Sequence, residues 1–363
     1  MPILPALLAA VLLTLSAAAQ NSAQIEALQR LKGMDLEANP ALKAAVVRVA
    51  EQSRGTPEYV ALVRDFKLAG QRDGLLEAAV KLAGQSAGAD AARLLLEQGE
   101  AAFLTERLRT GHPHEAAPLA QALGQTGDRA AVPMLLAALG NEDHAVRAAA
   151  IRGLAHTQDG ARELLRLARE DKLDERGRTT ASLELAQARW PDIKAEAAKL
   201  LPLPAAGDGA PLPPVEELVK LTGDPARGAK IFRSEQVACS RCHKVGDDGV
   251  DFGPALTEIG TKLDRRALYD SILDPSAGIS FGFEGWAVET RQGGELFGII
   301  TSETADEFAV KDQTGIVTRV KKADVTKREL QKSSVMPAGL AQVMTRQELV
   351  DLVEYLATLK KRP

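Results

Sequence analysis

Apolar residues recur at helical spacing through most of residues 21–200. In the clearest stretch, Val132, Leu135 and Leu139 share one face, and the stripe ends at Gly140; glycine commonly closes helices in this way. Similar stripes predict further helices over residues 75–83, 91–108, 116–123, 146–154 and 179–189.

Two of the predicted helices open with the same kind of turn. Asp128-Arg129-Ala130 and Asp159-Gly160-Ala161 occupy equivalent positions, so the segment repeats with a period of about thirty residues. The pattern resembles short HEAT-type helical repeats. This resemblance implies an α-solenoid over residues 21–200, in which stacked helix pairs bury their apolar faces together. Such an array offers a docking surface for proteins; the alternative is a structural domain without a partner of its own.

The pattern breaks at residues 201–214, which read LPLPAAGDGAPLPP. Five prolines and two glycines exclude a helix or a central strand. The segment is interpreted as an extended linker and a domain boundary, which leaves the orientation of the flanking domains free.

Beyond the linker, the spacing of apolar residues changes from helical to alternating and later returns to helical. Alternation predicts short strands over residues 286–290, 295–302, 307–311 and 316–321. Turn residues separate these strands, so they predict a small antiparallel sheet over about 285–322. The chain returns to helix over residues 345–359, where Thr345 and Glu348 form a capping box.

The chain contains two cysteines, and both belong to the pentapeptide Cys239-Ser240-Arg241-Cys242-His243. The spacing C-x-x-C-H is the signature of covalent haem c attachment. Both thiols add to the vinyl groups of one porphyrin, and the adjacent imidazole ligates the iron. A zinc site would need further cysteine or histidine ligands nearby. A thioredoxin-like pair would need a βαβ context, and a chance match is the remaining alternative.

The order of features around this motif resembles class I cytochromes c. Gly228 and Phe232 lie on one face of a helix opened by Asp224-Pro225, and the last helix carries Leu352 and Tyr355. In that family the first and last helices cross through such residues. More narrowly, the segment from about residue 225 to 359 resembles the larger haem-binding domains with a β-rich insert. The haem-binding domain as a whole is expected over residues 215–363.

The resemblance implies a set of haem ligands. Pro254 matches the proline whose carbonyl orients the proximal histidine, here His243. Met336 matches the distal ligand, and Met344 is its rival. The implied cofactor is one covalent haem c held by Cys239 and Cys242. The expected fold is mainly α: a HEAT-like α-solenoid followed by a cytochrome c-type helical domain with a small antiparallel insert.

Residues 1–20 form an apolar run that ends in small residues. It is interpreted as a signal peptide, so a periplasmic or otherwise exported protein without a stable membrane span is expected; the alternative is an uncleaved anchor. The formal net charge of −4 argues against nucleic acid as a partner. His112 and His114 flank Pro113, but two surface histidines without a third ligand are a weak metal site.

These features predict an electron-transfer protein and not an enzyme. It would pass single electrons from a periplasmic dehydrogenase to a downstream acceptor, with the repeats as a docking scaffold. The alternative is a haem-based enzyme or sensor, peroxidase-like or responsive to gas or redox state, with a displaceable distal ligand. A run of basic residues could steer an acidic redox partner or simply be solvated. Its members are Arg319, Lys321, Lys322, Lys327, Arg328 and Lys332.

Overall fold

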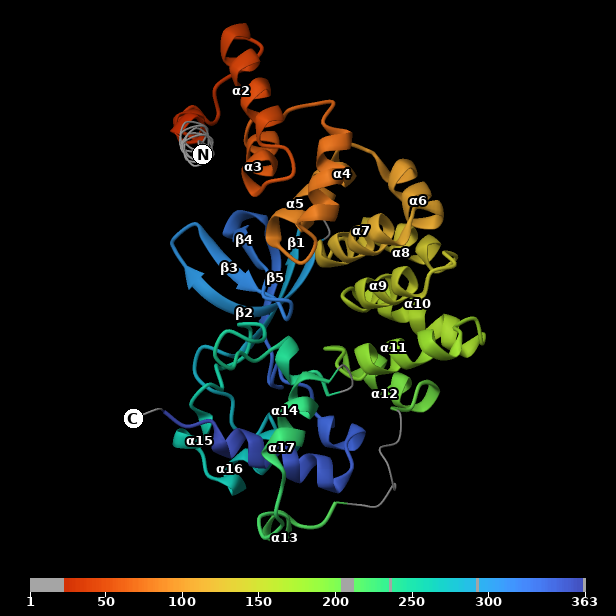
Figure 1. Cartoon of the computed structure of the whole chain (residues 1–363). Coiled ribbons are helices and arrows are strands. Elements are labelled where there is room, and N and C mark those ends of the chain that lie inside the picture. Colours follow the sequence, from red (N-terminus) through yellow and green to blue (C-terminus); the bar gives the residue numbers. More distant parts are fainter. Residues whose placement is uncertain (1–22, 204–211, 235–236, 292–293, 362–363) are drawn as a thin grey trace, which may run out of the picture.

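The structure is a computed structural model that describes residues 23–203, 212–234, 237–291 and 294–361. The described part is mainly helical, with an array of helices followed by a helical domain and a sheet (Figure 1). The predicted signal peptide at 1–20 lies outside the described residues, as does the middle of the linker. No helix within the described ranges has the length and apolarity needed to cross a bilayer.

The helical array begins with a segment over 23–29 and continues to Leu200. Its helices are α2 (Pro40–Gln52), α3 (Pro57–Asp65), α4 (Arg72–Lys81), α5 (Ser86–Glu97), α6 (Ala101–Thr110), α7 (Pro113–Gln125), α8 (Val132–Ala138), α9 (His144–Ala155), α10 (Gln158–Arg169), α11 (Glu175–Leu185) and α12 (Pro191–Leu200), with a 3-10 turn η1 (Arg129–Ala131) before α8. Local signals fix many of the starts: Asp143 caps α9 and Thr157 caps α10 through their side-chain oxygens.

Small residues allow neighbouring helices to pack closely. Helix α7 packs on α9, and α9 packs on α11. At the first contact Gly124 faces Gly153, and a Cβ added at Gly153 would lie 2.9 Å from the Gly124 Cα. Apolar side chains on these helices form one continuous core, as stacked repeats require.

The predicted helix over 91–108 is wrong in one respect, because two helices occupy this stretch. Helix α5 ends at Glu97 and α6 begins at Ala101. Gly99 lies between them at φ +80°, a conformation that favours glycine and cannot continue a helix. The apolar stripe continues across the break, so the period alone did not reveal it.

The second helical domain is built from segments that precede and follow the sheet in the sequence. Its helices are α13 (Val215–Leu218), α14 (Pro225–Arg233), α15 (Ile259–Lys262), α16 (Arg265–Leu273) and α17 (Arg346–Thr358), with 3-10 turns η2 (Cys239–Arg241), η3 (Lys322–Asp324) and η4 (Leu340–Val343). Helix α17 starts with the expected capping box.

Helices α14 and α17 cross in close contact. A Cβ at Gly228 would overlap the Asp351 carbonyl oxygen, so glycine is needed at the crossing. The rings of Phe232 and Tyr355 meet there at 5.8 Å between centroids. Asp351 is buried and accepts hydrogen bonds from Arg227, which fixes the two helices together.

The sheet has five antiparallel strands in the order β4-β3-β2-β1-β5. They are β1 (Gly285–Thr290), β2 (Glu295–Glu303), β3 (Glu307–Lys311), β4 (Val317–Lys321) and β5 (Val325–Leu330). Four of them match the predicted strands to within a residue or so, but the sheet extends beyond the predicted end at 322. Strand β5 was missed because its charged side chains hide the alternation. It is an edge strand that pairs only with β1.

The expected cationic segment is largely neutralised, because four of its six residues form ion pairs. Arg328 and Lys322 both pair with Glu303, Arg319 with Glu307, and Lys327 with Glu329. Arg328 also stacks over Trp286, 4.4 Å from the ring centroid. These charges therefore act mainly within the sheet.

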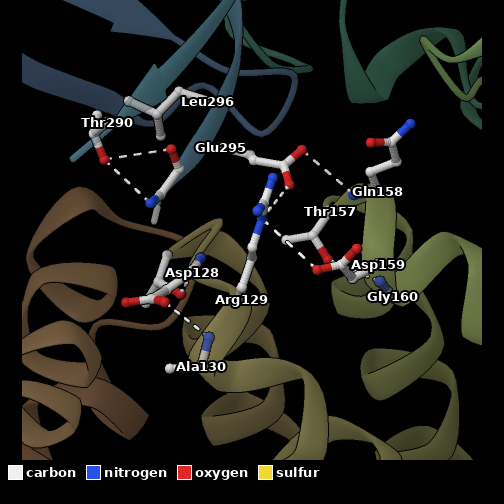
Figure 2. A network of polar contacts seen from close by, with 12 residues as sticks. Asp128, Arg129, Ala130, Thr157, Gln158, Asp159, Gly160, Thr290, Glu295 and Leu296 are labelled. Atoms are coloured by element: carbon white, nitrogen blue, oxygen red, sulfur yellow. Dashed lines mark hydrogen bonds and ion pairs between the residues drawn. The ribbon is translucent and has the colours of Figure 1, made fainter. Parts of the chain in front are cut away.

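A buried carboxylate joins the sheet to the repeats. Glu295, at the start of β2, has a side chain that is only 3% exposed. It accepts hydrogen bonds from Arg189 at 2.6 Å and from Arg129 at 2.9 Å. Figure 2 shows Arg129 reaching from the repeats to Glu295, with the backbone of Gln158 pointing to the same carboxylate.

Main-chain contacts extend this interface. The Glu295 amide donates to the Gly127 carbonyl at 2.8 Å, and Asp128 forms a β-bridge with Gly294. A Cβ at Gly127 would overlap the Glu295 carbonyl oxygen. The sheet is thus bound directly to the repeats, which differs from the free orientation that the linker composition suggested.

Removing Arg189 should destabilise this interface strongly. The Arg189→Ala variant leaves a buried carboxylate with one half-exposed partner, so we expect its free energy of unfolding to fall by about 3 kcal/mol or more. In the matched control Arg129→Ala, the lost side chain is 49% exposed, and a loss of about 1 kcal/mol or less is expected. Urea unfolding measures both variants, and equal losses would contradict the role given to burial.

The Glu303 cluster should make the sheet sensitive to acid. Hydrogen bonds from Arg328 and then Lys322 lower the pKa of Glu303 from 4.5 to about 2. Because the pKa of Glu303 is lower in the folded chain, its ionised carboxylate stabilises the fold at pH values above the ordinary pKa of 4.5. This stabilisation is lost as the pH falls from 4.5 toward about 2. Glu303→Gln should therefore lower the thermal midpoint more at about pH 6 than at about pH 3. Glu307→Gln, which removes a more exposed pair, is the control; a pH-independent effect of Glu303→Gln would refute the assignment.

Candidate functional site

The helical domain contains a cavity of about 510 Å³, within the size range of cofactor sites. Its walls come from α14, the C-x-x-C-H loop, α16, residues 274–283, the Met336 loop and α17. The lining is mostly apolar, with Phe232, Leu268, Leu352 and Leu356 among its members. The crossing of α14 and α17 positions this cavity, because Phe232 of α14 and Leu352 of α17 also line its wall.

The cysteine motif folds as a tight turn beside the cavity. Ala238 adopts a left-handed conformation at φ +55°, and a 3-10 turn follows over Cys239–Arg241. The His243 amide donates to the Cys239 carbonyl at 2.9 Å. This turn brings Cys239, Cys242 and His243 to the same cavity wall.

The two cysteines are half-buried thiols. Both are free of a disulfide. Burial raises the pKa of Cys239 to about 12 and that of Cys242 to about 11. Zinc ligands and redox-active pairs use thiolates with lowered pKa values. In addition, no three His, Cys, Asp or Glu side chains gather as a metal site in the described part of the chain. Within the described residues, the pair thus lacks the further ligands that a zinc site would need.

His243 is held in one tautomer. Its Nδ1 lies 2.8 Å from the Pro254 carbonyl oxygen; a carbonyl oxygen only accepts, so Nδ1 carries the proton and Nε2 keeps a free lone pair. Burial lowers the pKa of His243, while the bond to Pro254 opposes this shift. The neutral ring is thus the form suited to bind a metal ion.

Gly253 makes room for the imidazole. A Cβ at this position would lie 2.6 Å from His243 Cε1 and 2.9 Å from Nδ1. The backbone can therefore pass against the ring only because residue 253 lacks a side chain. The resemblance to class I cytochromes c points to the neighbouring Pro254, but no local pattern shows that residue 253 must be glycine.

Both candidate methionines line the cavity. Met336 is half-buried, and its amide donates to the Ser334 hydroxyl at 3.1 Å. Met344 is only 4% exposed and packs within the core of the helical domain. The more accessible Met336 has the greater freedom to reach a bound group.

The repeats and the sheet also reach this site. Gln187, which follows α11, and Gln313, between β3 and β4, both line the cavity. Arg241 of the cysteine motif lies 3.5 Å from Glu184, a buried carboxylate of α11. These contacts join residues far apart in sequence, and no local pattern could have revealed them.

The two histidines considered as a metal site lie at the start of α7. The rings of His112 and His114 stack, with centroids 5.6 Å apart. Within the described residues they have no third ligand. They are therefore best understood as surface residues.

Comparison with known proteins supports the solenoid. A profile of the family described as HEAT repeats matches residues 101–186. This match covers α6 through α11. It includes Arg129 and Gln158, which contact Glu295 of the sheet, and Glu184, which contacts Arg241 of the cysteine motif. The chain thus contains HEAT repeats, a fold that commonly serves protein docking. No curated protein matches the chain.

Substituting Gly253 should disturb the imidazole. The added methyl group of Gly253→Ala would clash with the His243 ring, so we expect the hydrogen bond to Pro254 to break. ¹⁵N-histidine NMR would then lose the Nδ1–H signal. Gly278→Ala is the control, since a Cβ there meets nothing within 4 Å. An unchanged histidine spectrum in Gly253→Ala would contradict the close packing.

Proposed function

We propose that this protein is an exported c-type cytochrome that carries one covalent haem and transfers single electrons. The observation that carries the proposal is the convergence of the C-x-x-C-H motif and a methionine on one cavity. Cys239, Cys242, His243 and Met336 all contribute to its wall. Two thiols for covalent attachment, with an imidazole and a thioether as axial ligands, are the groups of a His/Met c-type site.

The residues of the cavity fit such a group. The two thiols would supply the covalent attachment, and His243 and Met336 the axial ligands. The cavity is wide and mainly apolar, which suits a porphyrin face. Gly253 leaves the imidazole ring space that a larger residue would fill. When bound, a haem c supplies a one-electron iron couple.

The chain's own groups prepare this site. Pro254 fixes the orientation and tautomer of His243, and an oriented histidine is a better ligand. Apolar walls exclude water and would favour a high reduction potential. A His/Met pair would occupy both axial positions, which suits a carrier of electrons better than an enzyme.

The repeats are proposed as a docking scaffold in the same process. Such arrays commonly bind proteins on their extended surfaces. One surface is already used within the chain, because Arg129 and Arg189 hold the sheet through Glu295. The remaining surface would bring a periplasmic dehydrogenase or an acceptor within reach of the haem domain.

Loss of both cysteines should abolish covalent haem. We expect Cys239→Ala with Cys242→Ala to give a chain without c-type pyridine haemochrome bands, after co-expression with a haem-attachment system. The wild-type chain, expressed in parallel, should show them. A colourless wild-type protein would disprove the proposed function.

A second experiment distinguishes the methionines. Met336→Ala should abolish the weak red absorption band that a methionine sulfur gives on ferric haem, because its thioether would no longer reach the iron. Met344→Ala should keep the band, although loss of its buried side chain will destabilise the domain by about 2–5 kcal/mol. Loss of the band in Met344→Ala alone would reverse the ligand assignment.

A further inference from the structure

One wall of the cavity presents an aromatic side chain to solvent. Residues 275–283 line the cavity through Ile279 and Phe283, among others. Between these two residues, Phe281 is 96% exposed. Single exposed apolar residues are common on protein surfaces. Phe281 differs from such residues because it lies between two residues that line the cavity.

The backbone of this segment turns Phe281 outward. The Phe283 amide donates to the Ser280 carbonyl at 3.0 Å, which closes a turn around Phe281. Gly282 follows at φ +82° in open space, a conformation that favours glycine. The hydrogen-bonded backbone turn therefore places Phe281 on the outside of this segment.

The same segment is tied to the methionine loop. The Ser334 amide donates to the Ser276 hydroxyl at 3.1 Å, and the Met336 amide donates to the Ser334 hydroxyl at 3.1 Å. Two hydrogen bonds thus connect Ser276, near the start of residues 275–283, to the backbone of Met336. A protein bound at this turn would lie close to the proposed haem.

At the cysteine motif, the cavity wall is in contact with the repeats. Arg241 faces Glu184 of the repeats at 3.5 Å. Gln187 and Gln313 complete the cavity wall on this side, and Gln313 Nε2 lies 3.3 Å from His156 Nε2 of the repeats. A redox partner is thus directed toward the segment at 275–283.

The chemistry of this segment specifies the partner. All nine residues from Pro275 to Phe283 are uncharged. In contrast, the basic residues of β4 and β5 are mostly paired with acids in the sheet. Exposed aromatic residues are favoured anchors at the centre of interfaces, whereas charges mainly set the rate and salt dependence of association.

We infer that residues 275–283, with Phe281 at the centre, form the docking surface for a redox protein that presents an uncharged apolar face. This inference rests on the proposed function and adds the site and the chemistry of its partner.

The test measures binding to the full-length, haem-loaded protein. The probe is a blue copper protein with an apolar patch at its copper edge. We expect Phe281→Ser to weaken the Kd about tenfold or more in calorimetry, and Phe281→Leu to weaken it less than about threefold. Met34→Ser removes an apolar residue of the repeats that is 48% exposed, and should leave the Kd unchanged.

Two further measurements locate the interface. Hydrogen exchange of residues 275–283 should slow when the probe binds. Raising the ionic strength from about 0.02 M to about 0.2 M should change the Kd less than about twofold, because residues 275–283 carry no charge. The neighbouring Glu284 carboxylate accepts a hydrogen bond from the Gly282 amide within the turn.

Several results would overturn the inference. They are absence of binding, a Phe281→Ser variant that binds like wild type, or a steep salt dependence abolished by Lys321→Gln and Lys332→Gln. Self-association lost in Phe281→Ser would assign the surface to a second copy of this chain. Loss of haem from Phe281→Ser would assign Phe281 to the cofactor. A wild-type chain without haem c would refute the proposed function itself.

Discussion

The architecture depends on a carboxylate that is almost completely removed from water. Glu295 is 3% exposed, and a buried charge of this kind is tolerable only when it is fully paired. Its partners, Arg129 and Arg189, come from the repeats. Arg189 is itself buried between Trp190 and Phe297, at 4.6 Å and 5.9 Å from their ring centroids. Separation of the sheet from the repeats would therefore break these ion pairs and leave their charged groups without partners.

This interaction also bears on the candidate site. In the sequence, the sheet lies between the cysteine motif and Met336. The two segments that carry the proposed haem ligands are therefore both linked to the sheet through the chain. The repeats contact the same cavity through Gln187 and, by way of Glu184, through Arg241. The site is thus framed by three parts of the chain: the crossing of α14 and α17, the sheet, and the last matched repeats.

Local chemistry explains which elements could be predicted from the sequence. Asp224 before Pro225, and Thr345 with Glu348, cap α14 and α17 as expected. Four strands followed from alternation, and the solenoid from apolar spacing and a repeated turn. Each of these signals acts within a few residues, where the backbone's own hydrogen bonds decide the structure.

What could not be predicted depends on residues far apart in sequence. Glu295 and Arg189 are isolated charges until the fold brings them together, and Gln187 and Gln313 have no motif. Strand β5 forms because β1 offers it a partner, although half of its own residues are charged. Gly253 needs to be glycine only because the His243 ring lies against it. For the candidate site, the sequence therefore predicted a set of chemical groups, which the fold places around one cavity, and left their supporting neighbours unknown.

The placement of Glu295 has a consequence for the order of assembly. The ribosome completes Arg129 and Arg189 more than a hundred residues before Glu295, and helical repeats fold through contacts between neighbours. The solenoid can consequently form early, with both guanidinium groups still hydrated. Desolvation of Arg189, the buried one of the two, is deferred until β2 is made, so the sheet would form on a helical array that is already folded. The N-terminal array thus acts as an internal folding platform for the segment that follows it.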